Sequence, residues 1–115
     1  AHPRGFGAFP RILGKYVRAE HALTLEDAVR KMTSLAAEHA GLTRRGKIAP
    51  GYHADLTLFD PATVQDRSTP KEPHLTAVGI AQVWVNGRSV WRDGRTTGEH
   101  PGQVLKRKPT AARTP

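Results

Sequence analysis

The sequence predicts an α+β fold in which helices come first and a small antiparallel sheet follows. Apolar residues recur with the period of a helix in the first 45 residues, and from Gly46 onward they alternate with a period of two. The dipeptide Asn86-Gly87 lies between two alternating runs, where it favours a tight hairpin turn. With 115 residues, 37% of them hydrophobic, the chain is long enough to form one small domain.

The first helix is predicted to follow an opening loop. Pro10 suits the first helical position, because the N–H that proline lacks would have no partner there. Gly14 lies inside this helix, at a cost of about 1 kcal/mol relative to alanine. Five apolar side chains would form its buried stripe: Phe9, Ile12, Leu13, Tyr16 and Val17.

A second helix is predicted between Thr24 and Gly41. Thr24 and Asp27 resemble a capping box, in which the threonine hydroxyl accepts a hydrogen bond from a free N–H group of the first turn. Gly41 would end the helix in the left-handed conformation, and Leu42 would fold back onto the last turn in a Schellman motif. The buried face would consist of Leu25, Ala28, Val29, Met32, and Leu35 or Ala36.

The second half of the chain predicts strands. A strand is expected in residues 54–61, between the turn dipeptide Pro50-Gly51 and the turn former Asp60. Residues 62–76 are polar and contain prolines, which is typical of a long loop.

A hairpin is expected in residues 80–95, with the type I′ turn at its centre. A two-residue turn places Val83 opposite Val90, and it places Trp84 and Trp91 diagonally on the other face, close enough to touch. Two or three strands rarely form a stable sheet alone, so the predicted sheet is incomplete.

The composition excludes several classes of function. The chain has no cysteine, which excludes disulfides, thiolate chemistry and cysteine-based zinc sites and suits a cytoplasmic protein. No apolar run approaches the roughly 20 residues of a membrane span, and we expect no signal peptide. The net charge of +8 comes from scattered lysines and arginines, with one cluster at 106–108, so we do not expect a nucleic-acid partner.

The individual residues form no catalytic constellation. None of the six histidines is part of an HxH or HExxH pair, so the chain has no recognisable metal ligand set. Asp55 and Asp60 lie at opposite ends of one predicted strand and would not converge. No nucleophile–base motif is present either.

The opening stretch HPRGFGAFPR, residues 2–11, is the strongest candidate site. Arg4 offers a planar guanidinium that can bind a carboxylate with two parallel hydrogen bonds. Gly5 and Gly7 would let the backbone turn tightly or a ligand approach, and Phe6 could line an apolar pocket. The alternative is a simple N-terminal loop with a solvated arginine.

Four segments resemble the C-terminal part of N-acyl-D-amino-acid deacylases, which belong to the amidohydrolase superfamily. They are HPRGFGAFPRILGKYVRAE, LTLEDAVRKMTSLAAEHAGL, RGKIAPGYHADLTLFDPATVQDR and VWVNGRSVWRDGRTTGEHPGQVLKR, which together cover nearly all of residues 2–107. Ala36 departs from the family, which usually has proline there.

The resemblance implies a fold that is an α+β fragment. Residues 1–45 would hold the site loop and the last two helices of a TIM-like barrel, whose active site lies at its C-terminal face. Residues 46–105 would be the C-terminal strands of a small β-sandwich, which strands from the N-terminal segment complete. Residues 106–115 would be a basic, disordered tail.

The resemblance also implies a function. The parent enzyme would be a metal-dependent hydrolase in which zinc polarises the amide carbonyl and activates water, while an aspartate moves the proton. Its metal ligands and this aspartate would precede the present chain, which would therefore contain no catalytic or metal-binding residue and be inactive alone. Arg4 would bind the substrate carboxylate, supported by a loop of His2, Gly5, Phe6 and Gly7.

The implied partners are an N-acyl-D-amino acid and the remaining barrel and N-terminal sandwich strands of the parent. Two alternatives come from other classes. The chain could be a stand-alone interaction module that docks to a separate barrel half, or a basic nucleic-acid-binding domain.

Overall fold

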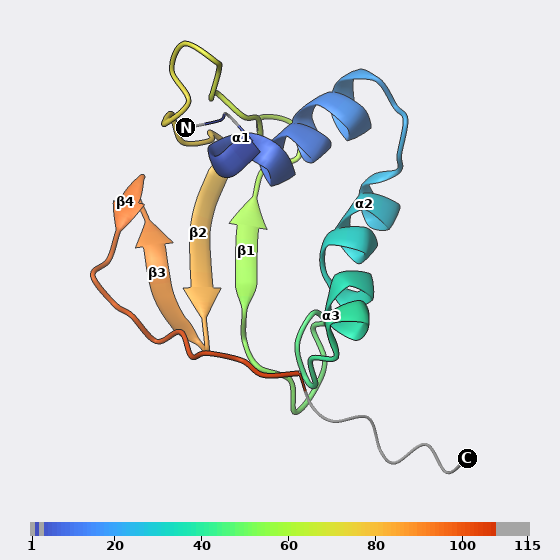
Figure 1. The fold of residues 1–115 in the computed structure, drawn as a ribbon, viewed down its shortest axis with the longest axis vertical. Helices are drawn as coiled ribbons and strands as arrows, with labels where there is room; N and C mark the ends of the chain where they lie inside the picture. Colours follow the sequence, from blue (N-terminus) through green and yellow to red (C-terminus); the bar gives the residue numbers. More distant parts are fainter. Residues whose placement is uncertain (1, 3, 108–115) are drawn as a thin grey trace.

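A helical layer and a four-stranded antiparallel sheet lie side by side (Figure 1). The structure, a computed structural model, describes residue 2 and residues 4–107, and of Arg4 and Phe6 it describes the backbone only. The helical elements are α1 (Arg4–Arg11), the π-helix η1 (Ile12–Ala19), α2 (Leu25–Met32) and α3 (Ser34–Ala40). The strands are β1 (Leu56–Phe59), β2 (Ile80–Val85), β3 (Arg88–Arg92) and β4 (Arg95–Thr96).

The first helix differs from its prediction. It begins at Arg4, so Pro10 lies inside α1 and not at its first position. Proline removes one backbone hydrogen bond, and two residues later the helix widens to the π form, in which the N–H of Glu20 bonds to the carbonyl of Lys15 at 2.8 Å. Of the predicted apolar stripe only Leu13 is buried, while Phe9 is 64% exposed.

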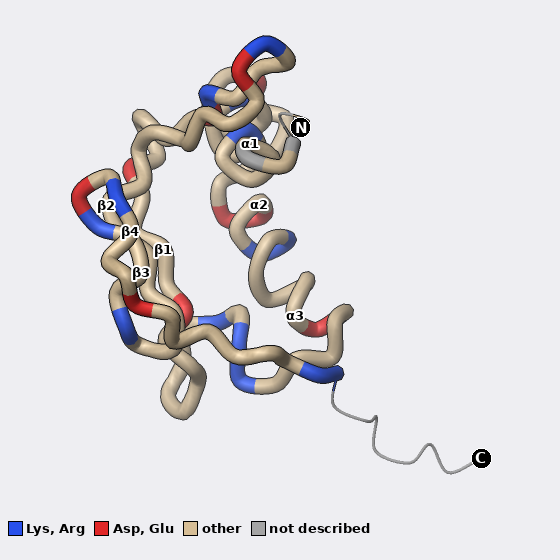
Figure 2. The backbone as a smooth tube through the Cα atoms, turned by 60° about the vertical axis from the view of Figure 1, so that its left-hand side comes forward, with Lys and Arg blue, Asp and Glu red and all other residues tan. Residues whose placement is uncertain are grey.

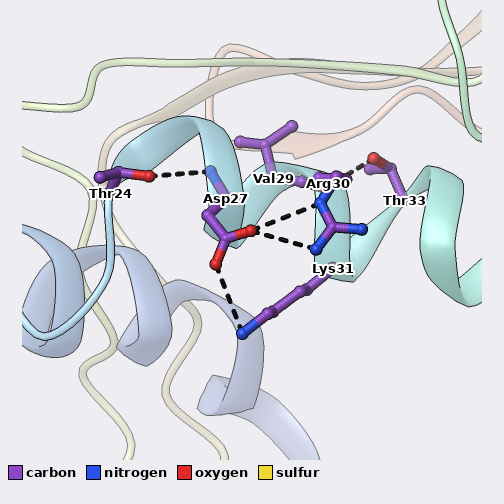
Figure 3. A network of polar contacts seen from close by, with 6 residues as sticks. All are labelled: Thr24, Asp27, Val29, Arg30, Lys31 and Thr33. Carbon is purple, nitrogen blue, oxygen red and sulfur yellow. Dashed lines mark hydrogen bonds and ion pairs between the residues drawn. The ribbon is translucent and has the colours of Figure 1, made fainter.

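The start of the second helical segment confirms the predicted cap (Figure 3). The hydroxyl of Thr24 accepts a hydrogen bond from the N–H of Asp27 at 3.1 Å. The carboxylate of Asp27 pairs with Arg30 at 3.2 Å and with Lys31 at 3.4 Å. Hydrogen bonds from these two side chains lower the pKa of Asp27.

The predicted single helix is interrupted at Thr33, which separates α2 from α3 with φ −125° and ψ −88°. Its hydroxyl donates to the carbonyl of Val29 at 2.6 Å, a side-chain bond that competes with the helix ladder. Ala36 therefore lies in the first turn of α3, where proline would also be accepted because the N–H groups there need no helical partner.

The end of α3 confirms the predicted Schellman motif. Gly41 has φ 72°, and its N–H bonds to the carbonyl of Glu38 at 3.1 Å. The N–H of Leu42 reaches back to the carbonyl of Ala37 at 3.0 Å.

The strands follow one another in the order β1-β2-β3-β4. Positive φ angles of 49° at Asn86 and 78° at Gly87 confirm the hairpin turn. The predicted register beyond the turn is wrong. Val83 lies opposite Trp91 and Trp84 lies opposite Ser89, with a bulge between them, so the two tryptophans do not form the diagonal pair.

The segment that follows β4 bonds to β3 at the bulge. The N–H of Thr97 bonds to the carbonyl of Val90 at 3.0 Å, and the Thr97 hydroxyl donates to the carbonyl of Ser89 at 2.6 Å. The extra residue in β3 thus directs its backbone to the outer neighbour and not to β2.

The polar stretch after β1 is firmly anchored at its start. The carboxylate of Asp60 accepts the N–H of Ala62 at 2.8 Å, which confirms its role as a turn former. Val64 is fully buried, and Gly79 lies directly against it: a Cβ on Gly79, which has φ 83°, would be 2.4 Å from the Val64 Cα. We call residues 60–68 the docking loop.

The core is small and lies at one end of the two layers. Leu13, Ala28 and Val64 form a buried cluster, against which Phe59 and Ile80 of the sheet pack. Beyond this cluster an open apolar cavity of about 650 Å³ separates the helices from the sheet, with Phe9, Met32, Ile48 and Val83 among its lining residues.

A polar cluster joins the layers at the other end. Arg45, whose side chain is 10% exposed, forms an ion pair with Asp55 and donates to the Asn86 side chain at 3.0 Å. Burial raises the pKa of Asp55, but the backbone N–H of Asn86, at 2.8 Å, and the Arg45 guanidinium outweigh it and bring the pKa below its usual value.

The C-terminal segment runs from β4 along the foot of the sheet to the end of α3 (Figure 1). The Asn86 side chain donates to the carbonyl of Pro101 at 2.8 Å on the way. At α3, the side chain of Arg107 lies so close to Gly41 that a Cβ there would be 2.6 Å from the Arg107 Cγ. Within the described part of the chain, no helix has the length and apolar character to cross a membrane.

Candidate functional site

The opening motif is helical and does not form the predicted loop. Gly5, Phe6 and Gly7 lie in the first turns of α1, and the N–H of Gly5 bonds to the carbonyl of the exposed His2 at 3.0 Å. The backbone of Arg4 begins the helix, but its side chain, like that of Phe6, lies outside the described residues. Carboxylate binding by Arg4 therefore stays a prediction.

Gly7 shows why a glycine-containing stretch forms a helix here. It is buried, and a Cβ at this position would lie 2.6 Å from the Ser68 Oγ and 2.9 Å from the Asp66 Cβ. Only glycine lets α1 approach the docking loop this closely, which offsets its poor helix propensity.

One turn further along α1, Arg11 pairs with Asp66 of the docking loop. Its Nη1 lies 3.5 Å from the Asp66 Oδ2, and the two side chains are 29% and 11% exposed. The Nε of Arg11 is buried without a hydrogen-bond partner among the described residues. The guanidinium thus holds the loop through one nitrogen only.

The contact continues along η1. A Cβ on Gly14 would lie 2.8 Å from the carbonyl oxygen of Val64, so this helix also approaches the loop backbone closely. Arg18 then donates through Nη1 to the carbonyls of Val64 at 2.7 Å and Pro61 at 3.1 Å, and through Nη2 to the Gln65 side chain at 3.0 Å.

Glycine and arginine therefore alternate along one face of the first helical segment, at Gly7, Arg11, Gly14 and Arg18. We call these four residues the docking face. Our sequence interpretation missed this face because it followed apolar residues alone. The signal was present in the spacing, since the four positions recur every three or four residues, as neighbours on one side of a helix do.

The remaining candidate chemistry stays dispersed. Among residue 2 and residues 4–107, no three histidine, aspartate or glutamate side chains gather closely enough to hold a metal ion. His39, His53, His74 and His100 are all exposed. Figure 2 shows lysines and arginines distributed over both layers, with acidic residues among them, along the part of the chain that the structure describes.

The sequence of this chain matches a known family. The family model described as "Amidohydrolase family" matches residues 1–91, and the chain belongs to this family. Within it, the chain is similar to deacylases that act on N-acyl-D-amino acids. It is 54% identical to an N-acyl-D-aspartate deacylase of Alcaligenes xylosoxydans xylosoxydans over 104 residues, which are 90% of this chain and 21% of the relative.

Solved structures of similar proteins have the same arrangement. The crystal structure of D-aminoacylase superposes with a TM-score of 0.90 at 53% identity, covering 92% of this chain and 22% of that one. N-acyl-D-glutamate deacylase from Bordetella bronchiseptica, in complex with zinc and a phosphonate mimic of the tetrahedral intermediate, gives 0.84 at 50% identity, covering 91% and 22%. The chain thus spans about a fifth of the length of these relatives.

Proposed function

We propose that this chain is the C-terminal part of a metal-dependent enzyme that deacylates N-acyl-D-amino acids, giving a carboxylate and a D-amino acid. The observation that carries the proposal is the 54% identity to a deacylase over 90% of the chain. The family model matches residues 1–91, which include Arg4 and its helix. In this proposal residues 1–45 belong to the barrel, residues 46–105 to the small β-sandwich, and residues 106–115 form a basic tail.

The open cavity supports the proposal that further parts of a larger enzyme pack here. Its walls are apolar, and Phe9 and Ile48, which line it, are 64% and 91% exposed. On β1, Leu58 is 55% exposed. Apolar surface of this kind usually marks an interface, and the partners we propose are the remaining barrel and the N-terminal sandwich strands of the parent.

We assign substrate binding, and no metal binding, to this chain. The described residues do not fit a zinc site, which needs three or more protein ligands close together. The metal of the proposed enzyme and its proton-transferring aspartate would be contributed by residues outside this chain, and the chain alone would be inactive.

Arg4 is the residue that we propose binds the substrate α-carboxylate. All N-acyl amino acids share this group, and a guanidinium can bind both of its oxygens while remaining charged at any physiological pH. Its place at the start of α1 suits this role, because a helix held by the docking loop presents its first residue from a fixed position. His2, Gly5, Phe6 and Gly7 would support it as neighbours in the same motif.

The test is Arg4→Ala in the full-length enzyme that contains this chain. Loss of a charge-assisted pair typically costs about 2–5 kcal/mol, so kcat/KM for an N-acetyl-D-amino acid should fall about 30- to 4,000-fold. Zinc content should stay unchanged, and Arg4→Lys should restore activity only in part. An equal loss for the carboxamide analogue, which has no carboxylate to bind, would show that Arg4 is structural.

A further inference from the structure

The helix that begins at Arg4 is held in place by the β half of the molecule. Gly7 lies three residues after Arg4 and Arg11 lies seven after it, about one and two turns along the same α-helix. Both contact the docking loop, Gly7 by close approach to Ser68 and Arg11 through Asp66. Because two turns of α-helix move nearly as a rigid body, these contacts also set where the backbone of Arg4 lies.

We propose that Arg11 and Asp66 are positioning residues for Arg4. Their ion pair fixes the first helix on the docking loop, and a displaced helix would carry the carboxylate-binding arginine away from its ligand. This inference rests on the function proposed above for Arg4. It gives the docking loop, which belongs to the β half, an indirect part in the proposed substrate recognition, through the position of Arg4.

The geometry of the pair predicts which substitutions it tolerates. Arg11 contacts Asp66 through Nη1 alone, at 3.5 Å, and its Nε has no partner among the described residues. A lysine ammonium can make the same single contact, so Arg11→Lys should keep the pair. Arg4 differs, because a lysine there would lose the two-point grip on a carboxylate.

Arg18 provides a matched control. It binds the same loop with three hydrogen bonds, but it lies in η1, fourteen positions from Arg4. Arg18→Ala should therefore lower the melting temperature without changing how the enzyme discriminates a carboxylate substrate from its carboxamide.

The experiment measures kcat and KM of the full-length enzyme for an N-acetyl-D-amino acid and for its carboxamide. Arg11→Ala and Asp66→Asn should each lower the acid-to-amide selectivity about 10- to 100-fold, mainly through KM for the acid, since small displacements of a binding group have effects of this size. Arg11→Lys should restore the selectivity. Equal losses for both substrates would overturn the proposal.

A double-mutant cycle separates this inference from the function on which it rests. If Arg11 acts through Arg4, then Arg11→Ala should lower the selectivity little further once Arg4→Ala is present. If Arg4→Ala leaves the selectivity unchanged, the proposed function is wrong. If Arg4→Ala abolishes it while Arg11→Ala and Asp66→Asn do not alter it, the function stands and the positioning role is wrong.

Discussion

The first helical segment has two sides, and they meet their surroundings in opposite ways. Toward the docking loop the contact is close, because Gly7 and Gly14 admit loop atoms that any side chain would displace, and Arg18 donates to three acceptors. Toward the sheet the contact is open, with an apolar cavity of about 650 Å³. In our proposal, the contact with the docking loop is internal to this chain, whereas the apolar cavity is filled by other parts of the full-length enzyme.

The difference teaches that polarity alone does not show which surface of a helix is buried against its own chain. The polar side contains two arginines and two glycines. It is closely packed because backbone carbonyls and a carboxylate of the docking loop accept hydrogen bonds from the arginines. The apolar side includes Phe9, which is 64% exposed because nothing among the described residues covers it. Three substitutions test the packing of the docking loop, of the open apolar side and of the polar cluster.

The largest effect is expected where the docking loop meets the sheet. Gly79→Ala should lower the free energy of unfolding by about 3 kcal/mol, because the new Cβ would meet the Val64 backbone at 2.4 Å. Gly51→Ala is the matched control: its φ of 82° is nearly the same, but nothing lies within 4 Å, so about 1 kcal/mol is expected. If urea denaturation gives equal losses of unfolding free energy for the two variants, the docking loop moves away from the new Cβ at little cost and the prediction is wrong.

A smaller effect is expected on the open side, and only in the full-length enzyme. Phe9→Ala should change the stability of the isolated chain by less than about 0.5 kcal/mol, as at exposed sites generally. In the full-length enzyme it should cost about 2 kcal/mol if the cavity is filled there. Val104→Ala, at a 93% exposed position outside the cavity, is the control. The same small effect of Phe9→Ala in both proteins would contradict a filled cavity.

The smallest effect concerns the polar cluster that joins the layers below the cavity. The pKa of Asp55 is lowered from 3.8, so its ionised form stabilises the fold above about pH 5, and this contribution is lost as the pH falls below 4. Asp55→Asn should therefore cost about 1 kcal/mol at pH 7, and the difference from wild type should shrink in acid. Asp93→Asn, at an 87% exposed carboxylate, should leave stability unchanged at both pH values.

Local signals in the sequence predicted the ends of elements well. Thr24 caps α2, Gly41 ends α3, and Asn86 begins the hairpin turn, because each of these depends on the chemistry of a few adjacent residues. The break at Thr33 and the bulge at Val90 were missed. At the break, the Thr33 hydroxyl bonds to the Val29 carbonyl, and Gly46 approaches the Thr33 carbonyl closely. The bulge involves partners outside its own strand, the bonds from Thr97 to β3.

The form of the opening motif was not predictable from the sequence, and its role as a binding site stays a prediction. The density of unusual residue types drew attention to residues 2–11. Gly5 and Gly7 were interpreted as a loop and Pro10 as the first helical position, yet the helix begins at Arg4. The low helix propensity of these residues is outweighed by a contact between residues 55 positions apart, the pair of Arg11 and Asp66. No pattern within the first helix identifies the acceptor on the other side.

The docking loop has a practical consequence for anyone who edits this protein. A polar, proline-bearing stretch between two strands is where insertions, epitope tags and deletions are usually placed. Residues 60–68 do not have this tolerance, because every change of length there would shift the surface against which the first helix packs. The exposed tip at residues 69–72 does have it. A tag placed at the tip should leave the proposed substrate recognition unchanged, whereas the same tag a few residues earlier should disable it.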